Sequence, residues 1–305
     1  MEFFKPGLNF DFVGKMKLVF VASMCAVAIS IISLVVHGGP LYGIDFAGGT
    51  LVQVKFKNAI SMSDIRDSLA SINMEQSVIQ RFGTVESNGY LIKSELSSSE
   101  IKGLATKIEG ALAAKFGKDS FEVQRVEVVG PKVGADLQKK GLYAVVFACV
   151  GILIYIAIRF EFRYAVGAII ALAHDITIVV GIFSLLNKEF SLTIIAALLT
   201  ILGYSNNDTI VVYDRIRENL KKTRRRSLAE TMNTSINETL SRTVITSGVT
   251  ALVVVALFFF GGAVIHDFAF ALIIGIVVGT YSSIFIASPV VLAWESVWPP
   301  KQKRK

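Results

Sequence analysis

Six long apolar segments dominate the distribution of hydrophobic and polar positions along the chain. They cover residues 18–36, 141–158, 164–186, 190–213, 243–265 and 268–294. A helix needs about 17–25 mostly apolar residues to cross a bilayer. The pattern therefore predicts a polytopic α-helical membrane protein with six transmembrane helices. We expect the first segment to remain as an anchor, because it is longer than the apolar part of a typical signal peptide and lacks a clear cleavage motif.

A different pattern fills the region between the first two apolar segments. Four stretches there are typical of strands, at residues 50–57, 77–83, 89–96 and 120–130, and two of helices, at 61–72 and 97–117. Strands alternate apolar and polar side chains, whereas helices repeat them every three or four residues. The order strand, helix, strand, strand, helix, strand predicts an α+β domain with a ferredoxin-like (βαββαβ) fold.

Capping residues mark the expected helix ends in this domain. We expect Ser63 to cap the first helix, a serine at 97–99 to begin the second, and Gly117 to end it. Residues 38–138 contain no His and no Cys, so this region offers no nucleophile–base pair and no metal-ligand spacing. We interpret it as a binding or mechanical module.

Charge indicates which side of the membrane each part faces. Of the 305 residues 53% are hydrophobic and only 18% charged, and the net charge is +7. Residues 38–138 hold 11 basic and 12 acidic residues, while most other Lys and Arg lie near the termini and in two loops at residues 159–163 and 214–242. Short basic loops stay in the cytoplasm. Both termini are therefore expected in the cytoplasm and the large insert outside, and nucleic-acid binding is not needed to explain the basic balance.

These patterns define the expected organisation of the chain. We predict a cytoplasmic N-terminal segment (1–17), a first transmembrane helix (18–36), an exported ferredoxin-like domain (37–138), a bundle of five further helices (139–294) with a cytoplasmic loop at 214–242, and a basic cytoplasmic tail (295–305). Cys25 and Cys149 fall in apolar segments and are interpreted as small core residues.

The fourth apolar segment carries an unusual polar turn. Tyr204, Ser205, Asn206, Asn207, Asp208 and Thr209 follow one another within it. Six consecutive residues surround a helix of 3.6 residues per turn, so this turn must be enclosed by protein or line a wet cavity. An ionisable side chain at mid-bilayer costs about 2.5–3.5 kcal/mol on insertion scales. Asp208 is therefore interpreted as a titrating group in a proton path, with hydrogen-bonded packing between helices as the alternative.

Other polar residues of the apolar segments have two readings each. His174 and Asp175 are either a second relay element or a mutually satisfied structural pair, and Arg242 is either an interfacial arginine or a counter-charge for Asp208. We expect His266 and Asp267 to be solvated turn residues. The pair Gly275 and Gly279 is typical of a helix contact face.

Three motifs resemble the SecF family. They are "YGIDFAGGTLVQVKF" after the first apolar segment, "LGYSNNDTIVVYDRIREN" in the fourth and "GTYSSIFIASP" in the sixth. The resemblance runs along essentially the whole chain, although Asn206 stands where many relatives would have an apolar residue. It implies half of an RND-type transporter. Asp208 matches the intramembrane aspartate of the family and Arg242 its intramembrane arginine, with Tyr204, Ser205 and Asn207 arranged around the carboxyl.

The resemblance also implies partners and a function. A SecF subunit pairs with SecD beside the SecY/SecE/SecG translocon and the small subunit YajC in the bacterial inner membrane. It uses protons to promote late export of unfolded polypeptide. We expect no enzymatic activity and no cofactor. The alternatives are half of a proton-driven solute or lipid exporter, or a passive scaffold. In "DFAGGT", Asp45 is expected to cap a tight turn at Gly48 and Gly49, and a direct proton role for it is less favoured.

Overall fold

The computed structural model describes residues 9–82, 88–94, 103–222 and 226–298 of the chain. The chain divides into two compact units. One comprises Met1–Leu41, Tyr143–Lys188 and Thr193–Lys305, and the other comprises Tyr42–Leu142 and Glu189–Leu192. We refer to them as the transmembrane unit and, after the location expected for it, the exported unit.

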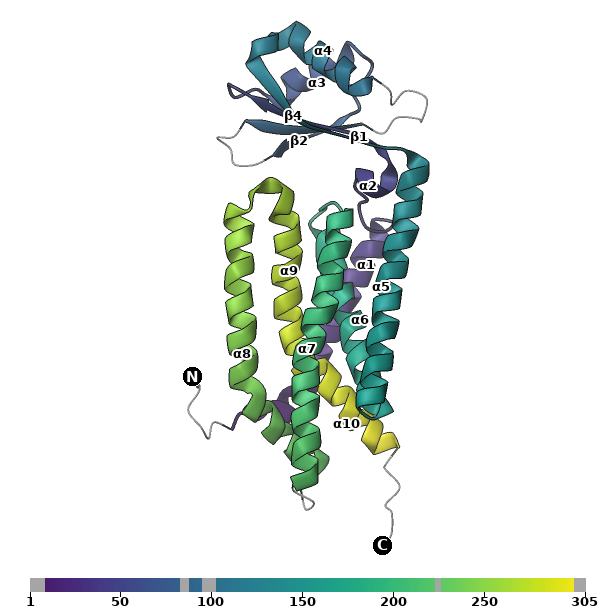
Figure 1. Cartoon of the computed structure of the whole chain (residues 1–305), viewed down its shortest axis with the longest axis vertical. Coiled ribbons are helices and arrows are strands. Elements are labelled where there is room, and N and C mark those ends of the chain that lie inside the picture. Colours follow the sequence, from purple (N-terminus) through teal and green to yellow (C-terminus); the bar gives the residue numbers. More distant parts are fainter. Residues whose placement is uncertain (1–8, 83–87, 95–102, 223–225, 299–305) are drawn as a thin grey trace. The chain divides into compact units, whose positions relative to one another are not determined.

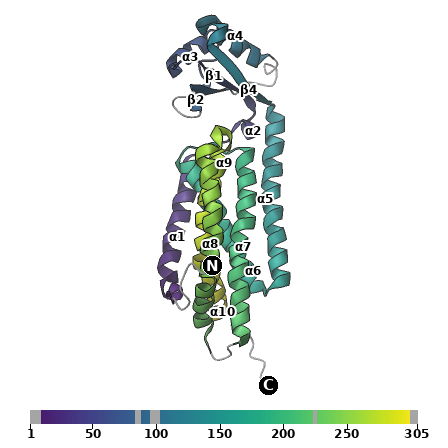
Figure 2. The same cartoon turned by 60° about the vertical axis from the view of Figure 1, so that its left-hand side comes forward.

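Six helices of the described residues are long and apolar enough to cross a membrane, as the sequence predicts (Figures 1 and 2). They are α1 (Phe12–Val36), α5 (Pro131–Arg159), α6 (Phe162–Leu185), α7 (Leu192–Lys222), α8 (Leu228–Phe260) and a last helix formed by α9 (Gly262–Ser282), the π-helical turn η3 (Ser283–Ala287) and α10 (Ser288–Val297). α5 and α8 begin well before the apolar segments, and α7 ends well after its own. Polar turns at their ends therefore continue the helices beyond the hydrocarbon layer.

The six helices differ in how much of their surface the chain itself covers. In the most apolar stretches of α6, α7 and the last helix more than half of the residues are buried, against fewer than a fifth in α1, α5 and α8. Cys25 on α1 is exposed and Cys149 on α5 is half-buried, so the expectation that both are core residues is wrong for Cys25. α6, α7 and the last helix therefore provide the protected interior in which polar groups can be placed.

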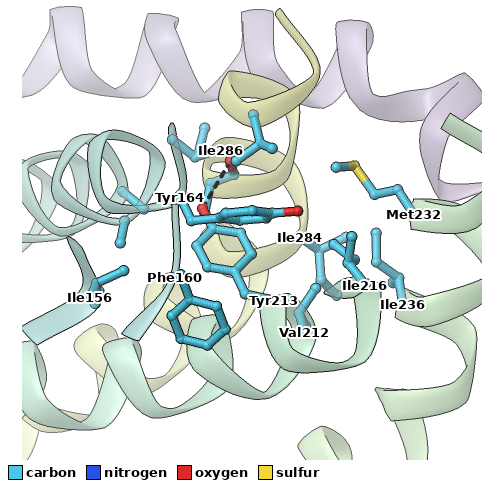
Figure 3. Packing of buried hydrophobic residues seen from close by; sticks show 14 of the residues in the cluster. Ile156, Phe160, Tyr164, Val212, Tyr213, Ile216, Met232, Ile236, Ile284 and Ile286 are labelled. Carbon is cyan, nitrogen blue, oxygen red and sulfur yellow. Dashed lines mark hydrogen bonds between the residues drawn. The ribbon is translucent and has the colours of Figure 1, made fainter. Parts of the chain in front are cut away.

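One hydrophobic cluster joins the inner helices (Figure 3). The rings of Tyr164 and Tyr213 meet edge to face with centroids 4.8 Å apart, and the Tyr213 hydroxyl donates to the Ala287 carbonyl over 3.2 Å. A Cβ at Gly167 would lie 2.5 Å from that hydroxyl. The absence of a side chain at Gly167 therefore lets α7 and the π-helical turn approach α6.

The exported unit has the predicted ferredoxin-like topology. Its strands are β1 (Gly49–Phe56), β2 (Val78–Phe82), β3 (Gly89–Ser94) and β4 (Phe121–Val129). The two helices that pack on them are α3 (Met62–Ala70) and α4 (Leu104–Phe116). The strands form an antiparallel sheet of order β2-β3-β1-β4, and both helices lie on one face of it (Figure 1). The core of this unit fills the space between that face and the helices.

The N-terminal caps of α3 and α4 differ from those expected. Ser61, rather than Ser63, caps α3, because its hydroxyl accepts from the Asp64 amide over 3.1 Å and the helix begins at Met62. The serines at 97–99 lie outside the described residues, and α4 begins at Leu104 with Gly103 at its N-cap. Gly117 follows the last residue of α4 with φ of +87°, as expected.

The "DFAGGT" segment forms the one-turn helix α2 (Ile44–Ala47) and leads into β1. Gly48 has φ of +80°, and a Cβ there would lie 2.9 Å from the Pro131 Cα, so this position requires glycine. The structure corrects the role expected for Asp45. Its Oδ2 accepts from the amide of Leu192, the first residue of α7, over 2.8 Å, so it caps α7 rather than its own turn.

His266 and Asp267 do not lie in a turn as expected, although their side chains remain 40% and 41% exposed. Both lie within α9, and the Asp267 carboxylate forms a 2.6 Å ion pair with Lys188. The turn between α8 and α9 is short, at Gly261 and Gly262, because Gly262 adopts φ of +72° there. The charged pair therefore joins the start of α9 to the end of the loop after α6.

The core of the exported unit provides a stability test. Ile92 is fully buried on β3, so Ile92→Ala removes packed methylenes and should cost about 2–5 kcal/mol. Val126 on β4 is 43% exposed, so Val126→Ala should cost less than about 1 kcal/mol. Limited proteolysis of the purified full chain across a denaturant series measures both. Equal losses would contradict the core described above.

Candidate functional site

Asp208 lies on the inner part of α7 and is only 3% exposed. Its Oδ2 accepts a hydrogen bond from the Ser247 hydroxyl on α8 over 3.2 Å. The Thr280 hydroxyl on α9 lies 3.0 Å from the same Ser247 oxygen. A chain of three polar side chains thus connects α7, α8 and α9 across the interior, and Asp208 is its carboxylate end.

The close approach of α9 to α7 depends on two glycines. A Cβ at Gly275 would lie 2.3 Å from the Ile201 side chain, and one at Gly279 would lie 2.7 Å from the Ser205 Cβ. Both separations are too short for a side chain, so α9 can approach α7 only with glycine at these positions. The expected helix contact face is therefore present, and it brings the polar turn of α7 against the polar part of α9.

The other side chains of the polar turn do not surround Asp208 in the way expected. Asn207 is exposed on the outside of α7, and within the described residues the buried Tyr204 hydroxyl and Asn206 Oδ1 have no hydrogen-bond partner. Buried polar atoms are normally paired with protein or with ordered water. The turn that carries Asp208 is therefore not saturated by hydrogen bonds from this chain.

Ser205 serves the second buried carboxylate rather than Asp208. Its hydroxyl donates to Asp175 Oδ2 on α6 over 2.6 Å, and the Ser282 hydroxyl on α9 donates to the same oxygen over 3.0 Å. The His174 ring nitrogen Nδ1 lies 2.9 Å from Asp175 Oδ1. Asp175 is fully buried and contacts three hydrogen-bonding groups, so its two oxygens are satisfied from three directions.

The hydrogen-bond network around Asp175 continues to α1. His174 Nε2 lies 3.1 Å from the Tyr281 hydroxyl, which accepts from the Ser23 hydroxyl over 3.1 Å. Sequence reasoning missed Ser23, Tyr281, Ser247 and Thr280. The motif "GTYSSIFIASP" contains two of them, Thr280 and Tyr281, but hydroxyl groups in an apolar segment do not by themselves show which carboxylate they face.

Arg242 is exposed on α8, and no ion pair within 4 Å joins it to a carboxylate in the described part of the chain. It lies on the same helix as Ser247, which binds Asp208, five residues earlier in the sequence. The hydroxyls of Thr246 and Thr250, which follow at helical spacing, donate to helix carbonyls one turn back, at 2.9 Å each. Arg242 is therefore near the site without belonging to its hydrogen-bonded interior.

The π-helical turn η3 lies against Thr209, the last residue of the polar turn of α7. In η3 the helix widens, and the Ser288 hydroxyl donates to the Ser283 carbonyl five residues earlier over 3.0 Å. The Thr209 and Ser283 hydroxyls are 2.8 Å apart. Single-turn π-helices inside α-helices occur frequently at functional sites. This one adjoins both buried carboxylates, since Ser282 binds Asp175 and Thr209 follows Asp208.

Within the described ranges, no three His, Cys, Asp or Glu side chains come together as metal ligands would. Among the acidic side chains of the described residues, Asp175 and Asp208 are the two that are buried. The chemistry available to this arrangement is the gain and loss of protons by carboxyl groups held among hydroxyls and one imidazole.

Two protein families match the sequence. Residues 109–297 match "Protein export membrane protein SecD/SecF, C-terminal", and residues 39–60, which include "DFAGGT", match the "SecD/SecF GG Motif". The first match includes both buried carboxylates, Ser247 and Arg242. The second includes Asp45.

Similar proteins of the same length are SecF subunits. The protein translocase subunit SecF of Magnetococcus marinus is 47% identical over all of this chain and 97% of its own length. The corresponding subunit of Vibrio alginolyticus is 43% identical over all of this chain and 97% of its own length. Both alignments extend through the two compact units.

Two solved SecDF structures are also similar to this chain. The crystal structure of SecDF, a translocon-associated membrane protein from Thermus thermophilus, is 40% identical with a TM-score of 0.85 over 95% of this chain, which spans 39% of that longer chain. A SecDF structure in the super-membrane-facing form, also 40% identical, gives a TM-score of 0.71 over 96% of this chain and 40% of its own. The fold is therefore that of the RND-like SecDF transporters. The chain belongs to the SecD/SecF family of protein export membrane proteins, in which its full-length relatives are SecF subunits.

Proposed function

We propose that this protein couples proton movement across the inner membrane to a late step of polypeptide export, with Asp208 as the group that gains and loses the proton. The observation that carries the proposal is the incomplete hydrogen bonding around Asp208. This buried carboxylate accepts one side-chain hydrogen bond, and its turn holds two further buried polar atoms without partners in the described residues. A carboxylate held in this way can change its protonation state without breaking a closed network.

The comparison with Asp175 supports this choice. Asp175 is held by Ser205, Ser282 and His174, and His174 is itself held by Tyr281. Hydrogen bonds to the ionised form stabilise that form. We therefore propose that His174 and Asp175 fix α6, α7 and α9 relative to one another, as the structural alternative holds, and that the titrating group is Asp208.

Arg242 has a long-range role in the proposed mechanism. Its side chain forms no ion pair with Asp208, and it lies five residues before Ser247, the hydrogen-bond donor to Asp208. An arginine so placed stabilises the ionised state without holding it permanently, whereas a direct buried ion pair would hold it tightly. Asn207 and Arg242, both exposed in this chain, then face the partner subunit that completes the site.

Coupling requires that a change of charge at Asp208 moves helices. One charge that crosses 100 mV releases about 2.3 kcal/mol, which is enough to shift a two-state equilibrium about fiftyfold. The two SecDF structures match this chain with the same identity but with TM-scores of 0.85 and 0.71, which suggests that this fold occurs in more than one arrangement. We propose that the π-helical turn beside Thr209 is the element that changes between the two states.

The partners follow from the relatives. This chain spans 39% of the SecDF chain, so we propose that SecD supplies the remaining part and completes the site. The SecDF structure is named as translocon-associated, which supports association with SecY, SecE and SecG. From the resemblance to the SecF family we propose YajC and the emerging unfolded polypeptide as further partners. We propose cytoplasmic termini and a periplasmic exported unit, because the basic loops are at the opposite ends of the helices from that insert.

Asp208→Asn should abolish the proton-driven part of export, by about tenfold or more, and leave assembly with SecD intact, because Asn keeps the shape and the hydrogen bond but cannot be ionised. The measurement is export into inverted membrane vesicles with and without a proton gradient. Asp214→Asn, on the exposed end of the same helix, is the matched control. Unchanged gradient-dependent export in the Asp208 variant would favour a passive scaffold, and an effect on solute efflux alone would favour an exporter.

Asp175→Asn should instead lower stability. It breaks a fully buried network with three partners, at a cost of about 2–4 kcal/mol, whereas Asp208→Asn should cost less than about 1 kcal/mol. Thermal unfolding of the purified chain in detergent, followed by circular dichroism, compares the two variants directly. A larger loss for the Asp208 variant would reverse the roles proposed for the two carboxylates.

The proposed role of Arg242 requires its charge and not its geometry. Arg242→Lys should retain most of the gradient-dependent export, because a lysine keeps the positive charge near Asp208, and Arg242→Gln should lose it. The same vesicle assay measures both. If lysine fails as completely as glutamine, the guanidinium makes a specific bidentate contact in the assembled complex, and the long-range role is wrong.

A further inference from the structure

A cavity of about 460 Å³ lies where α5 meets α6, beside the last turns of α7. It is separate from the buried carboxylates, and all of it belongs to the transmembrane unit. Its lining combines basic, aromatic and aliphatic side chains: Arg159, Arg217, Lys221, Phe160, Ile158 and Leu220. Its position near the helix ends and its mixed chemistry differ from those of the hydrophobic cluster next to it (Figure 3).

The cavity has an excess of positive charge. Of the described residues that line it, only Glu161 is acidic, and its carboxylate is bound over 2.9 Å by Arg163, which does not line the cavity. The Arg159 guanidinium forms a 3.2 Å ion pair with the Asp214 carboxylate. The positive charges of Arg217 and Lys221 are therefore left facing this space.

Arg217 and Lys221 have no carboxylate partner within 4 Å in the described residues. The Arg217 guanidinium donates to the Arg159 carbonyl over 3.2 Å, while the adjacent Lys222 has a partner, in a 2.6 Å ion pair with Glu218. Like charges four residues apart on a helix repel one another by roughly 0.2–0.5 kcal/mol. Two unpaired cations on one helix face thus suit an anion held between them.

The Phe160 ring in the cavity lining contacts two guanidinium groups. The Phe160 ring centroid lies 5.1 Å from the Arg159 guanidinium carbon and 6.0 Å from that of Arg217. The two guanidinium groups therefore gather on one buried ring. Planar guanidinium groups bind phosphate oxygens through paired hydrogen bonds, which is the contact that such an arrangement favours.

The depth of the cavity fits the headgroup layer. Arg217 lies 25 residues after the start of α7 at Leu192, or about 37 Å along the helix at 1.5 Å per residue. The hydrocarbon core is about 30 Å thick and the whole bilayer about 40–45 Å, so this point falls among the headgroups. Ile158 on the cavity rim is 82% exposed and offers an apolar surface next to the charges.

We propose that this cavity binds an anionic phospholipid, with its phosphate held by Arg217, Lys221 and Arg159 and its acyl chains along Ile158 and Leu220. Basic pockets between helices at the cytoplasmic side of membrane proteins bind such headgroups. The ligand is a lipid rather than a phosphate from solution, because the exposed isoleucine at the rim has no role in binding a soluble ion. The lipid would tie α5 to the end of α7, the helix that carries Asp208.

Native mass spectrometry of the purified full chain in detergent, titrated with phosphatidylglycerol, tests the proposal. The wild type should bind the first phosphatidylglycerol about tenfold or more tightly than phosphatidylcholine, which carries the same phosphate without net charge. The double variant Arg217→Gln, Lys221→Gln should lose that preference. The double variant Lys118→Gln, Lys222→Gln removes the same charge elsewhere on the surface and should keep it.

A single substitution at an exposed position distinguishes loss of lipid binding from misfolding of the double variant. Lys221 is exposed, so Lys221→Gln should fold normally and weaken phosphatidylglycerol binding about fivefold. Equal losses in the two double variants would overturn the site. Displacement of the lipid by glycerol phosphate at a similar concentration would show a soluble phosphate instead. Unchanged lipid binding with lost assembly with SecD would show that the cavity is a protein contact.

Discussion

The close contact between α7 and α9 is the packing feature on which the polar interior depends. Gly275 and Gly279 leave no side chain between the helices, so Ile201 and Ser205 lie directly against the α9 backbone. Ser205 of α7 and the Ser282 hydroxyl of α9 thereby meet at the same Asp175 oxygen, and Thr280 of α9 lies next to Ser247, which binds Asp208. A carboxylate cannot lie in hydrocarbon without such donors. Small residues therefore make it possible to bury two acids in one bundle.

The two acids have different surroundings although they lie on adjacent helices. The network of Asp175 is closed and extends to α1, whereas the turn of Asp208 keeps unpaired polar atoms. The helix that carries Asp208 also begins in the exported unit, where Asp45 caps its first amide. One helix thus holds the proposed proton site along its length and a contact with the GG motif at its start.

Much of this architecture could be predicted from the sequence. Burial in lipid requires long apolar segments, and burial of one face in a small domain requires apolar residues at helical or strand spacing. The six apolar segments, the order of strands and the enclosure of Asp208 by protein follow from those constraints alone. The partners of the polar groups could not be predicted. Ser247 lies 39 residues from Asp208, and only the relative rotation of two helices decides whether their side chains meet. For the same reason the sequence does not predict that Ser205 binds Asp175 or that Asp45 caps α7.

We propose that Asp208 changes its protonation state while Asp175 does not. Difference infrared spectroscopy of the complex with SecD in lipid, recorded across a pH jump, observes protonated carboxyl groups directly. A carboxyl band should appear as the pH falls, disappear in Asp208→Asn and persist in any Asp175 variant that still assembles. A band that persists in Asp208→Asn and is lost when Asp175 is replaced would show that Asp175 is the titrating group instead.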